Sequence, residues 1–307
     1  MSVMRKTVLA VSDNPAVKRL FRTGPVKRQL VDRFVAGETL ESALDAARAF
    51  SPEGITTTLD LLGENVTSVE QARTAVESYM AILPAMRDSG IEPNISVKLT
   101  MLGLDFGADV ARTNVVEILE SARDAGGFVR IDMEGSAYTD VTMRLFEDLY
   151  SLYPAQVGIV IQAYLHRAER DVERAIELGA RVRLVKGAYA EPESVAIQGT
   201  AGIDANYARL AHRLLAEGNY PAIATHDLDL IRSAKEFARV RQVSPERFEF
   251  QMLYGVRRDQ QLDLVADGYR MRVYIPYGTE WYPYFTRRIA ERPANALFVL
   301  RQLRDQS

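Results

Sequence analysis

Eight short runs of apolar and β-branched residues alternate with longer helical stretches from residue 55 onward. The runs are Ile55–Leu62, Asn94–Thr100, Phe128–Glu134, Val157–Tyr164, Arg181–Lys186, Pro221–His226, Arg247–Leu253 and Arg270–Ile275. Strands that alternate with helices are typical of parallel sheets joined by crossover connections. An open, doubly wound sheet is the alternative, but eight strands favour closure, and no GxGxxG motif follows any run. The sequence therefore predicts an α/β fold, a (βα)8 TIM barrel.

Helix ends fall between the predicted strands, as this fold requires. Thr67-Ser68-Val69-Glu70 predicts a capping box at the start of the first crossover helix. Gly90, Gly126 and Gly179 stand where helices should end before the next strand, as glycine C-caps do. Residues 1–50 show apolar positions at helical spacing and no clear strand. We therefore predict an N-terminal helical arm over residues 1–50 and a barrel domain over residues 51–307.

Composition excludes several classes of function. The net charge of −3 gives no indication of a nucleic-acid partner. The chain has no cysteine, which excludes disulfides, thiolate nucleophiles and cysteine-ligated metal clusters. No apolar run approaches the roughly 18 residues of a membrane-spanning helix. We expect a soluble protein, although a helix that lies along a membrane surface would escape this criterion.

Polar residues gather at the carboxyl ends of the predicted strands, where barrel enzymes carry their chemistry. Lys98 lies between two apolar residues and would be costly to bury without a partner. An ion pair with Asp132, on the next strand, would be a purely structural explanation. The same pair beside a cleft would suit a zwitterionic substrate, and both interpretations remain open at this point.

Lys186 suggests two different chemistries. A lysine at a strand end can form a Schiff base with a carbonyl substrate, as in a lyase or aldolase, and Lys98 could do the same. Lys186 is followed by Gly187-Ala188-Tyr189, however, and a lysine beside small residues more often binds phosphate. His226 could serve as a base, a phosphate contact or a metal ligand. No HxH or HExxH spacing occurs, so a zinc centre is not expected.

The segment after the last predicted strand combines an aromatic residue with adjacent arginines. Tyr284 precedes Arg287 by three residues and Arg288 by four, so the three project from neighbouring positions of a helix. Two guanidinium groups can hold a carboxylate through parallel hydrogen bonds. A solvated arginine pair that forms a salt bridge with Glu291 is the structural alternative.

Taken together, the motifs resemble the proline dehydrogenase family. In order along the chain they are Ser96-Val97-Lys98-Leu99, Asp132-Met133-Glu134, Gln162-Ala163-Tyr164, Arg183-Leu184-Val185-Lys186-Gly187-Ala188-Tyr189, Thr225-His226-Asp227, Glu249-Phe250-Gln251-Met252-Leu253-Tyr254-Gly255, Tyr274 and Tyr284-Phe285-Thr286-Arg287-Arg288-Ile289-Ala290-Glu291. The length resembles the monofunctional bacterial form. The resemblance implies a distorted (βα)8 barrel whose final helix lies over the barrel mouth.

The resemblance also implies roles for individual residues. It implies catalytic roles for Asp132 and Arg183. It implies a substrate-binding group that consists of Lys98, Leu253, Tyr274, Tyr284, Arg287 and Arg288. It implies a cofactor-binding group that consists of Met133, Gln162, Arg183, Lys186, Gly187, Ala188, Thr225, His226 and Glu291.

The activity that the resemblance implies is the oxidation of L-proline to 1-pyrroline-5-carboxylate, the first step of proline catabolism. Hydride would pass to N5 of FAD, and the electrons would go on to a quinone. A cytoplasmic enzyme with peripheral contact at the inner face of the cell membrane is the corresponding expectation. A pyrroline-5-carboxylate dehydrogenase partner is left open. The Schiff-base chemistry of Lys186 or Lys98 and a non-enzymatic binding barrel are the competing hypotheses.

Overall fold

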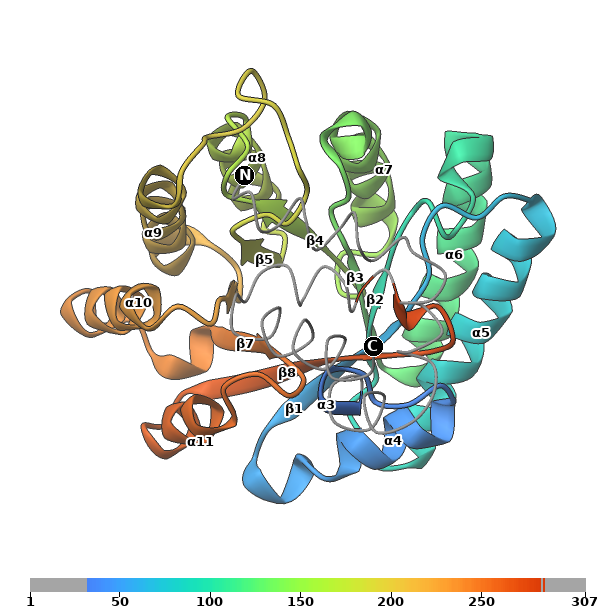
Figure 1. Ribbon diagram of the computed structural model, residues 1–307, viewed down its shortest axis with the longest axis horizontal. Coiled ribbons are helices and arrows are strands. Elements are labelled where there is room, and N and C mark those ends of the chain that lie inside the picture. The colour runs from blue at the N-terminus through green and yellow to red at the C-terminus, as the bar shows by residue number, and fades with distance from the viewer. Residues whose placement is uncertain (1–31, 283, 285–307) are drawn as a thin grey trace, which may run out of the picture.

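The computed structural model describes residues 32–282 and residue 284, and it contains a closed barrel of parallel strands in sequence order (Figure 1). The strands are β1 Thr56–Leu61, β2 Asn94–Val97, β3 Phe128–Ile131, β4 Val157–Gln162, β5 Val182–Val185, β6 Ala222–Ala224, β7 Glu249–Leu253 and β8 Arg270–Tyr277. Each predicted run contains one strand, and β8 alone extends beyond its run. The barrel closes through β1 and β8, which pair from Thr56 with Arg272 to Leu61 with Tyr277. The predicted barrel is confirmed.

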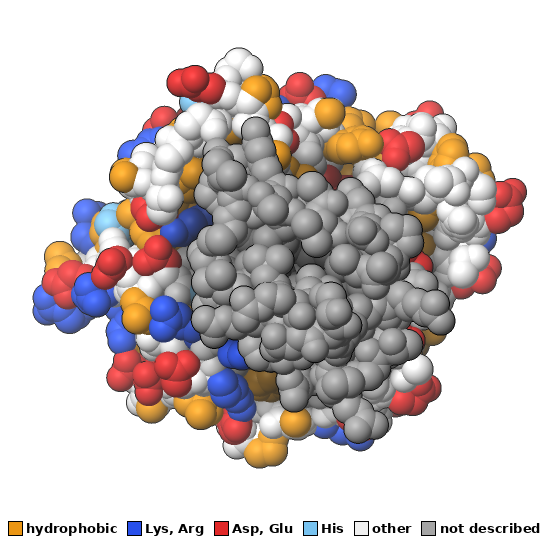
Figure 2. All heavy atoms as spheres, viewed as in Figure 1, with side chains coloured by type: hydrophobic (Ala, Val, Ile, Leu, Met, Phe, Trp, Pro, Cys, Tyr) orange, Lys and Arg blue, Asp and Glu red, His pale blue; other side chains and the backbone are white. Residues whose placement is uncertain are grey.

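Helices form a ring outside the strands (Figure 1). They are α4 Leu40–Arg48, α5 Val69–Asp88, α6 Ala108–Ala125, α7 Ser136–Leu152, α8 Ala168–Leu178, α9 Thr200–Glu217, α10 Leu228–Val240 and α11 Arg258–Ala266, with short 3-10 turns at Ser51–Glu53, Leu104–Phe106 and Pro245–Arg247. The short α3, Asp32–Phe34, precedes α4 and lies inside this ring. Around the rim of the face in Figure 2, acidic and basic side chains are interspersed.

The caps of these helices largely follow the sequence signals. Gly126 and Gly179 end α6 and α8 in the left-handed conformation, as predicted. At α5 the N-cap is Ser68, one residue later than the predicted capping box at Thr67 places it. Ser68 accepts from the backbone N–H of Gln71, whose side chain accepts from the N–H of Thr67. The reason is that serine caps a helix at least as well as threonine does.

Alternation along the strands divides the barrel into an apolar outer layer and a polar interior. Leu59, Ile95 and Val273 have no exposed surface and belong to the main hydrophobic core. Residues one position away point inward, because successive side chains of a strand face opposite sides. Arg183 of β5 reaches Ser96 of β2 and Gln251 of β7, which are not neighbouring strands. These contacts are formed through the barrel interior.

The described part of the predicted N-terminal arm packs directly on the barrel. Helix α4 lies against β1 and β8 in the gap between α11 and α5 (Figure 1). Its buried Ala43, Leu44 and Ala47 join the same hydrophobic core as the strands. The boundary at residue 50 stays a prediction. Residues 1–31, the earlier part of the arm, and residues 285–307, which include most of the predicted final helix, lie outside the described residues.

A short segment ahead of α4 is held at the carboxyl end of β8. The backbone N–H of Ala36 donates to the carbonyl of Pro276 at 2.9 Å, and the N–H of Gly278 donates to the carbonyl of Gly37 at 3.1 Å. Near the end of β7, Arg33 donates from Nε to the carbonyl of Gly255 at 3.3 Å. The segment is therefore fixed close to the end of the barrel where the chemistry is expected.

Gly255 should be required for this attachment. Its φ is +71°, and a Cβ built there would lie 1.6 Å from the carbonyl oxygen of Arg33. Gly268 has a similar φ of +85° but open space around its Cβ position, so Gly268→Ala reports left-handed backbone strain alone, about 1 kcal/mol. We expect Gly255→Ala to lose roughly 1–3 kcal/mol more, measured by urea unfolding. Equal losses in the two variants would contradict this packing.

Candidate active site

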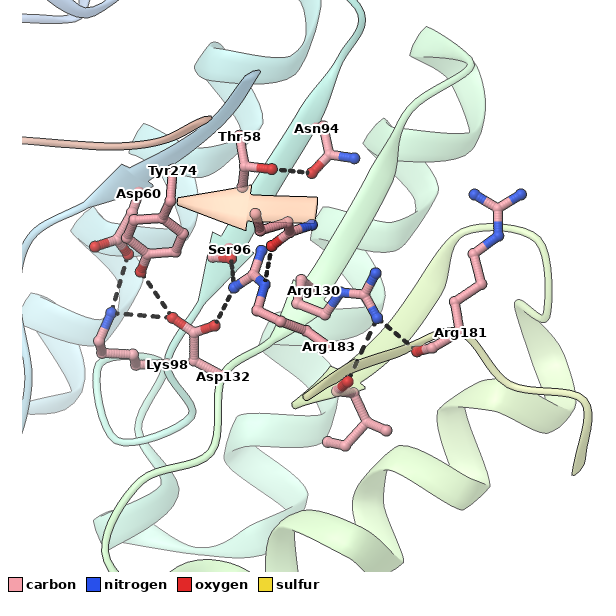
Figure 3. A network of polar contacts seen from close by, with 12 residues as sticks. Thr58, Asp60, Asn94, Ser96, Lys98, Arg130, Asp132, Arg181, Arg183 and Tyr274 are labelled. Atoms are coloured by element: carbon pink, nitrogen blue, oxygen red, sulfur yellow. Dashed lines mark hydrogen bonds and ion pairs between the residues drawn. The ribbon is translucent and has the colours of Figure 1, made fainter. Parts of the chain in front are cut away.

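The carboxylate of Asp132, which follows β3, collects donors from three other strands (Figure 3). Tyr274 of β8 donates its hydroxyl to Oδ2 at 2.8 Å. Arg183 of β5 donates from Nη1 to Oδ1 at 2.9 Å, and Nζ of Lys98 lies 3.4 Å from Oδ2. Asp132 retains 14% of its side-chain exposure, so this cluster lies at an accessible edge of the interior. The structure thus brings together four residues that the sequence singled out.

Arg183 is the most constrained member of this cluster. It is buried, and it donates from Nε to Oε1 of Gln251 at 2.6 Å and from Nη1 to the hydroxyl of Ser96 at 2.9 Å. Its guanidinium also lies 5.1 Å from the ring centre of Tyr274, within the range of a cation–π contact. The orientation of the group is therefore fixed by β2, β7 and β8 together.

Asp60 lies closer to Lys98 than Asp132 does, and the sequence did not assign Asp60 to the site. Nζ lies 3.0 Å from Oδ1 of Asp60 in β1, a carboxylate with no exposed surface. The signal for Asp60 was a charged residue within an apolar run. Burial opposes the charge of Lys98, but attraction to Asp60 and other anionic groups outweighs it and raises the lysine pKa well above its usual range.

Burial has the opposite consequence for Asp60. It disfavours the carboxylate strongly enough to raise the pKa of Asp60 from 3.8 to about 6, although the charge of Lys98 acts against this shift. The interior therefore holds a carboxyl group that changes its charge near neutral pH, next to a lysine that stays protonated.

Lys186, which follows β5, lies between two carboxylates. Nζ is 2.5 Å from Oδ1 of Asp204 on α9 and 2.9 Å from Oδ2 of Asp227. Partial burial opposes its charge, but the hydrogen bonds to both carboxylates prevail and raise the pKa of Lys186. Both lysines that could form a Schiff base are thus held protonated, a form that is not nucleophilic.

The residue after Lys186 has to be glycine. Gly187 has a φ of +117°, and a Cβ built there would lie 2.2 Å from the ring of Tyr164 at the end of β4. The backbone N–H of Tyr164 donates to the carbonyl of Lys186 at 2.9 Å, so the two strand ends stay close. Half-buried Ala188 continues the same loop. Small residues therefore follow the lysine, and the ring of Tyr164 packs against Gly187.

The loops after β6 and β7 are joined by a histidine. The backbone N–H of Leu253 donates to Nε2 of His226 at 2.9 Å. Thr225 is buried, and its hydroxyl accepts from the N–H of Asp227 at 3.1 Å. Because β5, β6 and β7 are neighbours in the barrel, these residues and Lys186 lie along one arc of its carboxyl end.

Gln162 and Met133 lie at the ends of β4 and β3, and β4 is the neighbour of β5, with Gln162 paired with Val185. Both side chains are buried, and Gln162 donates from Nε2 to the backbone carbonyl of Glu134 at 2.9 Å. The carboxylate of Glu134 accepts from both the N–H and the hydroxyl of Thr100. The strand ends β2, β3 and β4 are therefore tied to one another by side chains.

Three predicted residues, Arg287, Arg288 and Glu291, lie outside the described residues, so the carboxylate clamp stays a prediction. Tyr284 is described and is buried. Within the described ranges, no three or more His, Asp and Glu side chains are grouped so that they could hold a metal ion.

Asp60 should give the protein an unusual pH dependence of stability. Its folded pKa of about 6 exceeds the ordinary 3.8, so the folded state binds a proton at Asp60 between pH 8 and 5 while the unfolded chain stays mostly ionised there. Relative to Asp60→Asn, the wild type should therefore gain about 1 kcal/mol of unfolding free energy over this interval. Urea unfolding at several pH values measures this, with exposed Asp229→Asn on α10 as the control. If the difference in unfolding free energy between wild type and Asp60→Asn did not change with pH, the raised pKa of Asp60 would be contradicted.

Known proteins match this chain across nearly its whole length. A family model described as Proline dehydrogenase matches residues 43–301. The chain is 43% identical over 300 residues to Proline dehydrogenase of Deinococcus radiodurans, with 96% of each chain covered. It is 40% identical over 299 residues to Proline dehydrogenase 1 of Bacillus subtilis, with 97% of this chain and 98% of the relative covered.

Larger proteins match it over part of their length. The chain is 31% identical over 321 residues to Bifunctional protein PutA of Escherichia coli, a match that covers 89% of this chain and 24% of that protein. The solved structure of proline utilization A from Bdellovibrio bacteriovorus superposes with a TM-score of 0.82 at 27% identity, over 94% of this chain and 36% of that one. Since both the family model and full-length relatives match, this chain is an enzyme of the proline dehydrogenase family, of the monofunctional bacterial type.

Proposed function

We propose that the protein oxidises L-proline to 1-pyrroline-5-carboxylate with FAD, as the first step of proline catabolism. The observation that carries this proposal is the cluster of Lys98, Arg183 and Tyr274 around the carboxylate of Asp132. It combines two cations, one anion and an aromatic ring at the carboxyl end of the barrel. Such a cluster has the charges and the apolar surface that a zwitterion with a hydrocarbon ring requires.

The residues at the strand ends fit a flavin dinucleotide. Lys186 offers a cation beside the small residues Gly187 and Ala188, a combination that suits a pyrophosphate. Thr225 and His226 stand on the neighbouring strand end and would extend this group. Buried Gln162 and Met133, at the ends of the neighbouring strands β4 and β3, would contact the isoalloxazine. Glu291 would contribute from the final helix.

The protein's own residues would orient the substrate. Arg287 and Arg288 would bind the carboxylate of proline, and Lys98 would add a further positive charge. Leu253, Tyr274 and Tyr284 would pack over the ring. The reaction removes a hydride from the ring carbon beside nitrogen and a proton from the nitrogen, and FAD, when bound, supplies the hydride acceptor. Arg183 would stabilise negative charge that develops next to it, because its guanidinium is already fixed in place.

The electrons are proposed to go on to a quinone through peripheral contact with the inner face of the cell membrane. No helix in the described ranges is long and apolar enough to cross a membrane. Transfer of the product to a pyrroline-5-carboxylate dehydrogenase partner would correspond to the bifunctional PutA relatives, in which this chain matches 24% of the length.

The visible spectrum of the purified protein tests the proposal. We expect flavin absorption bands that bleach on anaerobic addition of L-proline, because hydride transfer reduces the bound FAD. The same sample without proline, kept anaerobic, is the control. Bands that persist after proline is added would mean that the protein binds flavin but that proline is not its substrate. A colourless protein that added FAD cannot restore would reject the proposal as a whole.

A further inference from the structure

A buried row of hydrogen-bonded polar side chains runs from Arg183 into the barrel interior. Nε of Arg183 donates to Oε1 of Gln251, and Nε2 of Gln251 donates to Oε1 of Glu249, two residues earlier on β7. Both carboxylate oxygens of Glu249 accept from Nε of Arg272 on β8, at 3.0 and 3.1 Å. All four side chains are at most 5% exposed. Nothing in the roles assigned above uses Gln251 or Glu249.

The charge of Glu249 determines which way the amide of Gln251 faces. An ionised carboxylate only accepts hydrogen bonds, so it holds the NH2 group of Gln251 and turns the amide oxygen toward Arg183. The reversed amide would place oxygen against a carboxylate and NH2 against a guanidinium, so both contacts would be repulsive.

Glu249 is kept ionised in this buried position by its neighbours. Burial raises the pKa of a carboxyl group, but the adjacent Arg272 charge and the hydrogen bond from Gln251 outweigh it and lower the pKa of Glu249. The hydroxyl of Tyr220 donates to Oε2 at 3.2 Å as well. Arg272 is itself held by the backbone carbonyl of Thr57 and by the half-exposed carboxylate of Glu92.

This row of side chains leaves one edge of the guanidinium of Arg183, the Nη2 group, available. Nε is occupied by Gln251, and Nη1 by Ser96 and Asp132, whereas Nη2 makes no hydrogen bond to any residue between 32 and 282 or to Tyr284. Because the guanidinium is rigid and planar, the acceptors at Nε and Nη1 together set the direction of Nη2. Gln251 holds the Nε edge of the group, so the direction of Nη2 depends in part on the acceptor that Gln251 presents.

We propose that Gln251 and Glu249 are positioning residues for Arg183, which set the direction of its free Nη2 donor toward the bound flavin. This inference rests on the proposed flavin chemistry. Gln251 acts on Arg183 directly, and Glu249 acts through Gln251 by fixing its amide. In this role the two residues stabilise the reduced cofactor, which carries more negative charge than the oxidised form.

The test is the reduction potential of the bound FAD, measured without substrate, together with kcat and KM for L-proline. Gln251→Met removes the acceptor without changing any charge. We expect stabilisation of the reduced flavin to weaken about tenfold, which lowers the potential by about 30 mV for a two-electron couple. We expect kcat to fall about tenfold and KM to change less than twofold, because the carboxylate of proline is proposed to bind Arg287, Arg288 and Lys98 and not Gln251.

Glu249→Gln separates positioning from simple electrostatics. Loss of the negative charge would by itself raise the reduction potential of the bound FAD. Release of the Gln251 amide would lower this potential, because Arg183 would lose its fixed acceptor. We expect the second effect to prevail, so the potential of Glu249→Gln should fall. Glu92→Gln is the charge-matched control, since it removes a carboxylate from the same Arg272 but leaves Gln251 and Glu249 in contact. The reduction potential of the FAD bound to Glu92→Gln should not fall.

An unchanged or raised potential in both Gln251→Met and Glu249→Gln would overturn the inference, even if both variants lose unfolding free energy. If Glu249→Gln does not fold, Gln251→Met alone decides, because it is neutral and close in volume. Failure of the proposed function is distinct from these results. It would appear as a wild-type protein that binds no FAD or whose FAD is not reduced by proline.

Discussion

The rest of the site depends on the hydrogen bonds that converge on the carboxylate of Asp132. Lys98, Arg183 and Tyr274 are all buried or half-buried, and each would be costly to bury without a partner. They come from three strands that do not lie next to one another in sequence, and they converge on one acceptor. Closure of the barrel through β1 and β8 is what brings Tyr274 to the other two. Fold and site are therefore formed together.

The interior of this barrel is not arranged for stability alone. Lys98, Arg130, Arg183 and Arg272 are buried cations, and burial lowers the pKa of Arg130 well below its usual range. Apolar side chains of similar volume would often be as stable as buried ion pairs, or more stable. The presence of these buried cations together with the buried carboxyl groups of Asp60 and Glu249 indicates a demand for fixed polar groups. A reaction that redistributes charge at the carboxyl end would impose this demand.

The sequence predicted the fold well because barrel strands are buried on both faces and stand out as apolar runs between helices. It also predicted that Lys98 pairs with Asp132, since adjacent parallel strands bring such residues together. It did not assign Asp60 or the Gln251–Glu249 pair, because contacts across a barrel depend on its stagger, which no local pattern encodes. The N-cap at Ser68 instead of Thr67 has another cause, the capping ability that serine and threonine share.

The most direct test of the role of Asp132 is the rate at which L-proline reduces the flavin of Asp132→Asn in a single anaerobic turnover. The amide cannot hold Lys98 and Arg183 as the carboxylate does, because it has lost its charge. We expect FAD content to be retained and reduction to slow by about 10²-fold or more, as when a charge-stabilising contact is removed. Reduction at the wild-type rate would contradict the central role of Asp132.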